Sequence, residues 1–121
     1  MSTHNQDQLI QELLNKDVEE LYIWLGRELY GTPAFPPSPR QLSQLAHSWM
    51  EKKGDDLRAL ICNDKNVVQL CNAETDGYDP ELVTAVADLI ASLVIGVSPF
   101  TVSVLLIKVG LRRFCADIWE V

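Results

Sequence analysis

The hydrophobic and polar positions of this chain repeat with the period of amphipathic helices. No proline interrupts the segment from Asn5 to Tyr30. Apolar residues recur there at steps of three and four positions, which places them on one side of a helix. The segment therefore predicts an amphipathic helix with a break near Asp17. Its apolar residues are Leu9, Ile10, Leu13, Leu14, Val18, Leu21, Leu25 and Leu29.

A proline-rich loop at 31–39 is predicted next, because residues that precede proline are pushed out of helical geometry. Ser38 and Pro39 then suit the N-cap and the first position of a second helix. We expect Gly54 to end this helix, since two lysines precede it and cations favour a helix C-terminus. Its apolar stripe comprises Leu42, Leu45, Ala46, Trp49 and Met50.

Two short helices are predicted around 57–61 and 67–71, joined at Asn63 and Asp64. The polar segment 72–79 then predicts an acidic loop. It imitates the first half of a calcium-binding loop, but Val83 stands where the twelfth position needs glutamate. We therefore expect no calcium site there.

The longest uncharged run extends from Leu89 to Ile107 and is broken by Gly96-Val97-Ser98-Pro99. A run of about 18 apolar residues or more can indicate a transmembrane helix. Here glycine can end one helix, while Ser98 and Pro99 can begin another, and each half is too short to cross a bilayer. We predict a buried C-terminal helical hairpin, at about 80–96 and 99–119.

Together these segments predict an all-α protein, a compact bundle of about six or seven helices without a sheet. The length of 121 residues suits a single helical domain over 1–121.

The charge of the chain limits the classes of partner that it is expected to bind. A formal net charge of -7 argues against nucleic acid, because binding to phosphate backbones needs clustered lysine and arginine. A signal peptide would show a positively charged start followed by an apolar segment, and we find no such pattern. We therefore expect a soluble, cytoplasmic protein. We expect no membrane span.

The cysteines Cys62, Cys71 and Cys115 are odd in number and show no CxxC spacing. Each lies within an apolar helical pattern, which favours buried free thiols over a metal site or a disulfide. Free thiols also suit a reducing compartment.

Catalytic chemistry has little support. His4 and His47 are the two histidines, too few for a multi-histidine metal centre or a convincing histidine-based hydrolase. Most acidic pairs stand at expected helix starts, where they interact with the helix dipole. We predict a protein that is not an enzyme and holds no cofactor or metal.

Two surfaces are candidates for binding a partner. The basic cluster of the last helix either favours that helix C-terminus or docks against an acidic surface of a partner or a second copy. The aromatic residues beside the inward face of the first helix pack either internally or against a partner. The candidate residues are Lys108, Arg112, Arg113, Tyr22, Trp24, Glu19 and Glu20.

These features predict a protein-interaction or adaptor module that self-associates or docks to a larger signalling or defence-type assembly. Two alternatives stay open. The apolar hairpin could be masked in a soluble form and insert into a membrane when triggered. A pocket between the helices could instead hold a small apolar ligand or lipid.

Overall fold

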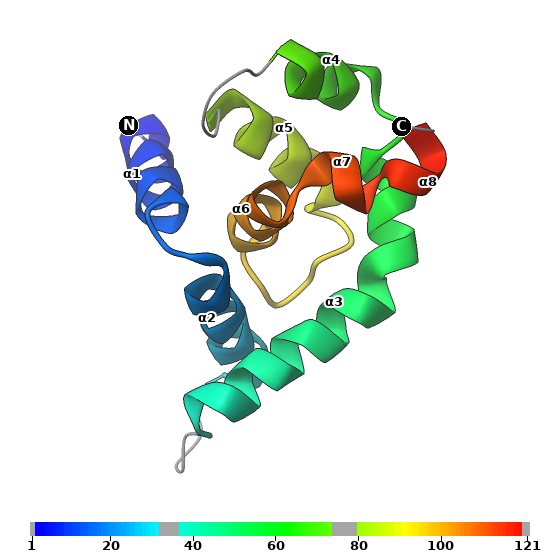
Figure 1. The fold of residues 1–121 in the computed structure, drawn as a ribbon. Helices are drawn as coiled ribbons and strands as arrows, with labels where there is room; N and C mark the ends of the chain where they lie inside the picture. The colour runs from blue at the N-terminus through cyan, green and yellow to red at the C-terminus, as the bar shows by residue number, and fades with distance from the viewer. Residues whose placement is uncertain (1, 32–36, 74–79, 120–121) are drawn as a thin grey trace.

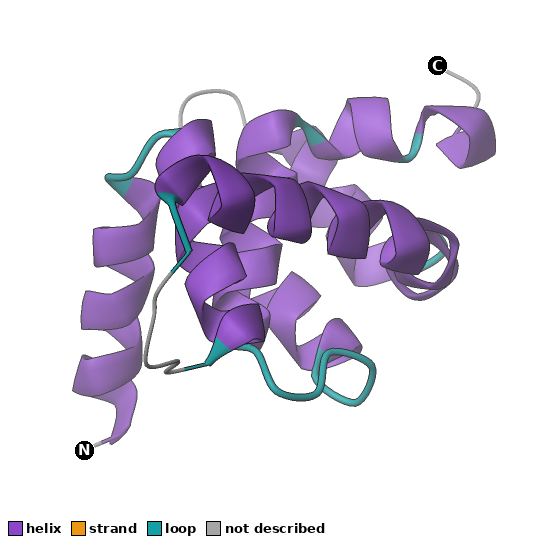
Figure 2. Cartoon of the chain, turned by 90° about the horizontal axis from the view of Figure 1, so that it is seen from below, coloured by secondary structure: helices purple, strands orange, loops and turns teal. Residues whose placement is uncertain are grey.

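A computed structural model of the chain describes residues 2–31, 37–73 and 80–119, which form helices joined by turns and loops (Figures 1 and 2). These residues contain no strand, and their helices pack into a bundle, as the sequence predicts. The elements are α1 (Ser2–Leu14), α2 (Val18–Tyr30), α3 (Pro39–Ile61), α4 (Lys65–Ala73), α5 (Pro80–Ile90), α6 (Pro99–Val109), α7 (Leu111–Phe114) and α8 (Ala116–Trp119).

The core is built around α6, in which every residue from Thr101 to Ile107 is buried. A helix that is apolar on all sides is stable in a water-soluble fold only when other elements cover it. Accordingly α6 contacts α1, α2, α5 and α7 (Figure 1). Its buried Ser103 hydroxyl donates a hydrogen bond to the Val83 carbonyl at 2.7 Å, so the polar atom is satisfied within the core.

The N-terminus of α6 is held by a carboxylate from another helix. Ser98 and Pro99 occupy the predicted N-cap and first positions, but the Ser98 side chain makes no capping hydrogen bond. Instead, the Ser98 backbone N–H donates to Glu28 Oε1 at 2.7 Å, and the buried Thr101 hydroxyl donates to Glu28 Oε2 at 2.8 Å. A negative charge at a helix N-terminus also interacts favourably with the helix dipole. Glu28 thereby fastens α2 to α6.

The predicted hairpin is present, since α5 packs against α6, but both of its helices are shorter than expected. The first ends at Ile90 rather than near Gly96. There the backbone N–H groups of Leu93 and Val94 both donate to the Ile90 carbonyl, which forms a turn. The second ends at Val109, and Gly110 then turns the chain with a φ of +120°. The apolar pattern concealed both boundaries because the residues beyond them also pack on the core.

The prediction that Gly54 ends a helix is wrong. Helix α3 continues through this glycine to Ile61. A glycine inside a helix costs about 1 kcal/mol relative to alanine, but the burial of Leu57 and Ile61 beyond it outweighs that cost. The predicted break near Asp17 is confirmed, and its side chain caps α2 by accepting from the Glu20 N–H at 2.8 Å. The predicted start at Ser38 is confirmed too, since Ser38 forms a capping box at the start of α3.

The prediction of three free thiols is also wrong. Cys62 and Cys115 form a buried disulfide with their Cα atoms 5.6 Å apart, which joins the end of α3 to the junction of α7 and α8. The half-buried Cys71 lies outside this bond. Because the two partners are 53 residues apart, their pairing depends on the tertiary fold. Free thiols were the reason to expect a reducing compartment, and the disulfide weakens that expectation.

Parts of the predicted proline-rich loop and acidic loop, 32–36 and 74–79, lie outside the described residues. Among the residues that are described, no helix is sufficiently long and apolar to cross a membrane.

Replacing Glu28 by glutamine is expected to lower the free energy of unfolding by about 1–3 kcal/mol. The glutamine amide has one acceptor oxygen where the carboxylate uses two, so one hydrogen bond loses its acceptor and the other becomes neutral. Urea denaturation followed by circular dichroism measures the change. Glu12→Gln, at an exposed position of α1, is the control and should change stability by less than about 0.5 kcal/mol. Equal losses in the two variants would contradict the role of Glu28.

Removing the disulfide with the double variant Cys62→Ala and Cys115→Ala is expected to lower the free energy of unfolding by about 2–4 kcal/mol, since the unfolded chain gains conformational freedom. Urea denaturation with and without a dithiol reductant measures this change. The reductant should destabilise the wild type and leave the double variant unaffected. A wild-type midpoint that does not respond to reduction, verified by thiol counting, would count against the disulfide's contribution.

Candidate partner-binding groove

The basic residues predicted to bind a partner reach toward different parts of the fold. The Lys108 ammonium group donates a hydrogen bond to the Lys16 carbonyl, just after α1. Arg112 donates to the Cys71 carbonyl at 3.5 Å and to Asn72 Oδ1 at 3.3 Å, near the end of α4. Arg113 is exposed on α7. Lys108 and Arg112 therefore join helices within the molecule.

The acidic and aromatic candidates lie on α2. Glu19 and Glu20 are exposed in its first turn, where carboxylates favour the helix dipole. Trp24 is half-buried, and the Lys16 ammonium group lies 4.7 Å from the centre of its ring. This cation–π contact and the packing of the ring on the core give Trp24 an internal role.

Tyr22 connects α2 to α3. Its ring stacks on the exposed His47 with the ring centres 3.6 Å apart and the planes 19° from parallel. Burial raises the pKa of the Tyr22 phenol above its ordinary value, and the negative charge of Glu19 raises it further. Of the seven predicted candidates, Tyr22 is the one that lines a hollow beside α3.

A hollow of about 490 Å³ lies beside α3, where α2, α6 and α7 approach it. We name it the Gly54 groove after the glycine in its α3 wall. Its lining residues are Tyr22, His47, Met50, Glu51, Gly54, Asp55, Arg58, Leu106, Val109 and Phe114.

The groove combines apolar surface with charged surface. Met50, Leu106, Val109 and Phe114 provide the apolar part. Leu106 is buried, whereas 39% of Val109 is exposed, so the apolar surface extends from the core to solvent. An apolar group bound against this surface would leave water, which is favourable.

Arg58 joins the α3 and α7 walls of the groove. Its Nε donates to the Phe114 carbonyl at 3.0 Å, and its guanidinium carbon lies 4.5 Å from the centre of the Phe114 ring. Its Nη1 also pairs with the exposed Asp55 at 3.3 Å. An exposed pair of this kind stabilises a fold only slightly, whereas the contacts to Phe114 hold α7 against α3.

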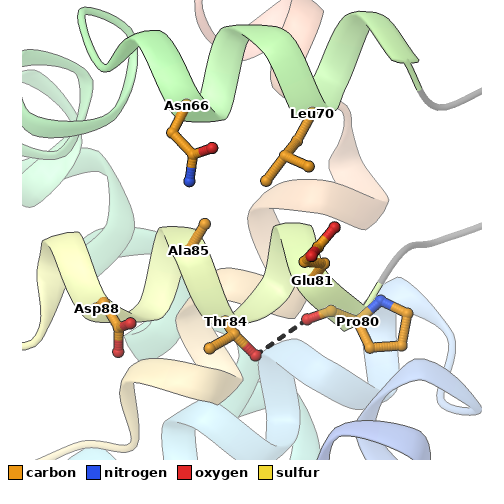
Figure 3. A pocket seen from close by; sticks show the side chains of 7 residues that line it. All are labelled: Asn66, Leu70, Pro80, Glu81, Thr84, Ala85 and Asp88. Carbon is orange, nitrogen blue, oxygen red and sulfur yellow. Dashed lines mark hydrogen bonds between the residues drawn. The ribbon is translucent and has the colours of Figure 1, made fainter.

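A second hollow, of about 590 Å³, lies between α4 and α5 (Figure 3). Leu70 and Asn66 point toward α5, from which Ala85 points back. The Thr84 hydroxyl donates to the Pro80 carbonyl at 3.0 Å, within the same helix. Across the described residues, no three or more histidine, cysteine, aspartate or glutamate side chains are placed to hold a metal ion.

Most of the Gly54 groove was missed in the sequence because its residues come from four helices. The signal that could have found it is Gly54 itself, a glycine between apolar positions of helical spacing, which we interpreted as a helix end. Comparison of the chain with known protein families, curated proteins and solved structures finds no match. The function proposed below therefore rests on the groove and the fold.

The raised pKa of Tyr22 predicts that the free energy of unfolding falls at alkaline pH. Because the folded protein holds the phenol proton more tightly than the unfolded chain, this contribution is complete below about pH 10 and is lost as pH rises through the folded pKa. The titration curve of the Tyr22 phenol is obtained by ultraviolet absorbance, as the difference between the curves of the wild type and the variant Tyr22→Phe. Glu19→Gln should bring the titration nearer to the ordinary value. A Tyr22 titration at or below that of free tyrosine would contradict the predicted direction.

Proposed function

We propose that this protein is a non-enzymatic interaction module that binds a segment of a partner protein in the Gly54 groove. In this proposal the bundle is a rigid support, and binding links the partner to other molecules, as in an adaptor. If the partner is a second copy of this chain, the same groove mediates self-association.

The observation that carries the proposal is the joining of an apolar surface and a charged rim in one groove. Protein interfaces combine an apolar centre with a polar edge and are enriched in tyrosine, methionine, phenylalanine and arginine. The groove contains one of each, at Tyr22, Met50, Phe114 and Arg58. Val109 adds an exposed apolar side chain at its edge.

A small apolar ligand is a second candidate, since the volume of the groove falls within the usual range of about 300–1,000 Å³ for ligand pockets. The exposed carboxylates of Glu51 and Asp55 favour a protein segment, which can offer charge beside an apolar side chain. Membrane insertion of the hairpin has less support, because α6 is covered by other helices and fastened by Glu28.

The experiment compares Val109→Arg with Ile95→Arg. Both substitutions place a cation at an exposed apolar side chain, but only Val109 lines the groove. Affinity capture from the native host, with quantitative mass spectrometry, and light scattering after size exclusion report partner binding and self-association. We expect Val109→Arg to reduce binding at least about tenfold, because a longer, charged side chain replaces apolar contact surface at the edge of the groove.

Ile95→Arg should keep the wild-type partners and oligomeric state. Equal binding by Val109→Arg and the wild type would place the interface elsewhere. A wild-type monomer that enriches no protein would contradict the interaction module itself.

A further inference from the structure

The α7 wall of the Gly54 groove is a helix too short to be stable by itself. It has four residues, as has α8 after it, whereas isolated helices shorter than about 12 residues are marginal in water. Gly110, with a φ of +120°, separates α7 from α6, so α7 is not the end of a longer helix. The position of α7 therefore depends on its attachments to the rest of the fold.

Two of these attachments join α7 to the end of α3, and they are neighbours in both helices. Arg58 donates to the Phe114 carbonyl at 3.0 Å and lies over the Phe114 ring. Cys62, one turn after Arg58, is bonded to Cys115, the residue after Phe114. Because the covalent bond keeps Phe114 beside α3, Arg58 meets it at a high effective concentration. Breaking the disulfide therefore weakens the Arg58 contacts as well.

The other attachments of α7 are not covalent. Leu111 is buried in the core, and Arg112 donates to the Cys71 carbonyl at 3.5 Å, which is long for a hydrogen bond. The Arg58 side chain is 37% exposed, so water competes for its contacts. A short segment held in this way opens locally at a lower free energy than the whole fold.

The disulfide is buried, with 2% of Cys62 and 0% of Cys115 exposed, so a reductant reaches it when this end of the molecule opens. A dithiol then reduces the bond in two exchange steps. Its first thiolate attacks one sulfur and displaces the other as a thiolate, and its second thiol then attacks the mixed disulfide. The dithiol leaves as a cyclic disulfide, and the two cysteines take up its two electrons and two protons as thiols.

We propose that the Cys62–Cys115 disulfide is a redox switch of the Gly54 groove. The oxidised protein presents the complete groove, whereas reduction by a dithiol releases α7 from α3 and takes Phe114 out of the groove wall. This inference rests on the proposed function and adds the regulation of the same site.

Amide hydrogen exchange of the full-length protein, with and without dithiothreitol, tests the release of α7. The backbone N–H groups of Phe114, Cys115 and Ile118 are hydrogen bonded and report on this end of the chain. On reduction, verified by thiol counting, their exchange should become at least about tenfold faster. It should also depend weakly on urea, because opening α7 exposes little surface, while α2 keeps the steep dependence of global unfolding.

The capture experiment described above tests the effect on binding. The double variant Cys62→Ala and Cys115→Ala is expected to capture the partners of the wild type at least about tenfold less well. Cys71→Ser is the matched control, because this cysteine lies outside the disulfide, and it should capture as the wild type does. Circular dichroism verifies that both variants are folded, and the exchange experiment needs neither of them.

Equal exchange in the oxidised and reduced protein, or a urea dependence at α7 as steep as that of α2, would overturn the switch. So would a folded double variant that captures the wild-type partners equally well. If Val109→Arg loses its partners in that case, the interaction module stands and its redox control is wrong. If Val109→Arg and the double variant both capture as the wild type does, both proposals fail.

Discussion

The burial of α6 on all sides is the constraint on which the rest of this structure depends. A helix without a polar face cannot lie at the surface, so other helices must surround it. Glu28 makes this arrangement specific, because its carboxylate accepts from both Ser98 and Thr101 at the start of α6. Packing alone would tolerate some sliding of α6 along α2, whereas hydrogen bonds to a charged group fix the register.

The Gly54 groove follows from a second constraint, the fastening of the chain's C-terminal part to α3. Arg58 holds Phe114 of α7 through the carbonyl and the ring, and one turn further along α3 the Cys62–Cys115 disulfide repeats the connection. The α3 and α7 walls of the groove are thus cross-linked. A surface whose walls are fixed in this way loses little conformational entropy when it binds a partner.

The sequence predicted those parts of the fold that depend on neighbouring residues. The break near Asp17, the N-cap at Ser38 and the apolar helix after Pro99 are local, and the structure confirms them. The disulfide and the Glu28 contacts join residues 53 to 73 positions apart, and helical periodicity does not encode such pairs. The helix end predicted at Gly54 failed for a related reason, since tertiary burial overrode the local preference of glycine.

The same distinction applies to the candidate site. Tyr22 stood out because it lies off the inward face of its helix, but its partner His47 comes from another helix. The groove is an assembly of residues from α2, α3, α6 and α7, so that only the order of the helices in space brings them together. Single residues of the site were therefore recognisable, while the site as a whole was not.

Three cations of this chain hold helices together through backbone carbonyls. Lys108, Arg112 and Arg58 each donate to a backbone carbonyl, at Lys16, Cys71 and Phe114 respectively. These carbonyls lie at or just after helix ends, where carbonyl groups lack partners within their own helix. Cations that hold helix ends together have less freedom to meet a partner's charge. The net charge of -7 adds a long-range attraction for a partner of positive charge.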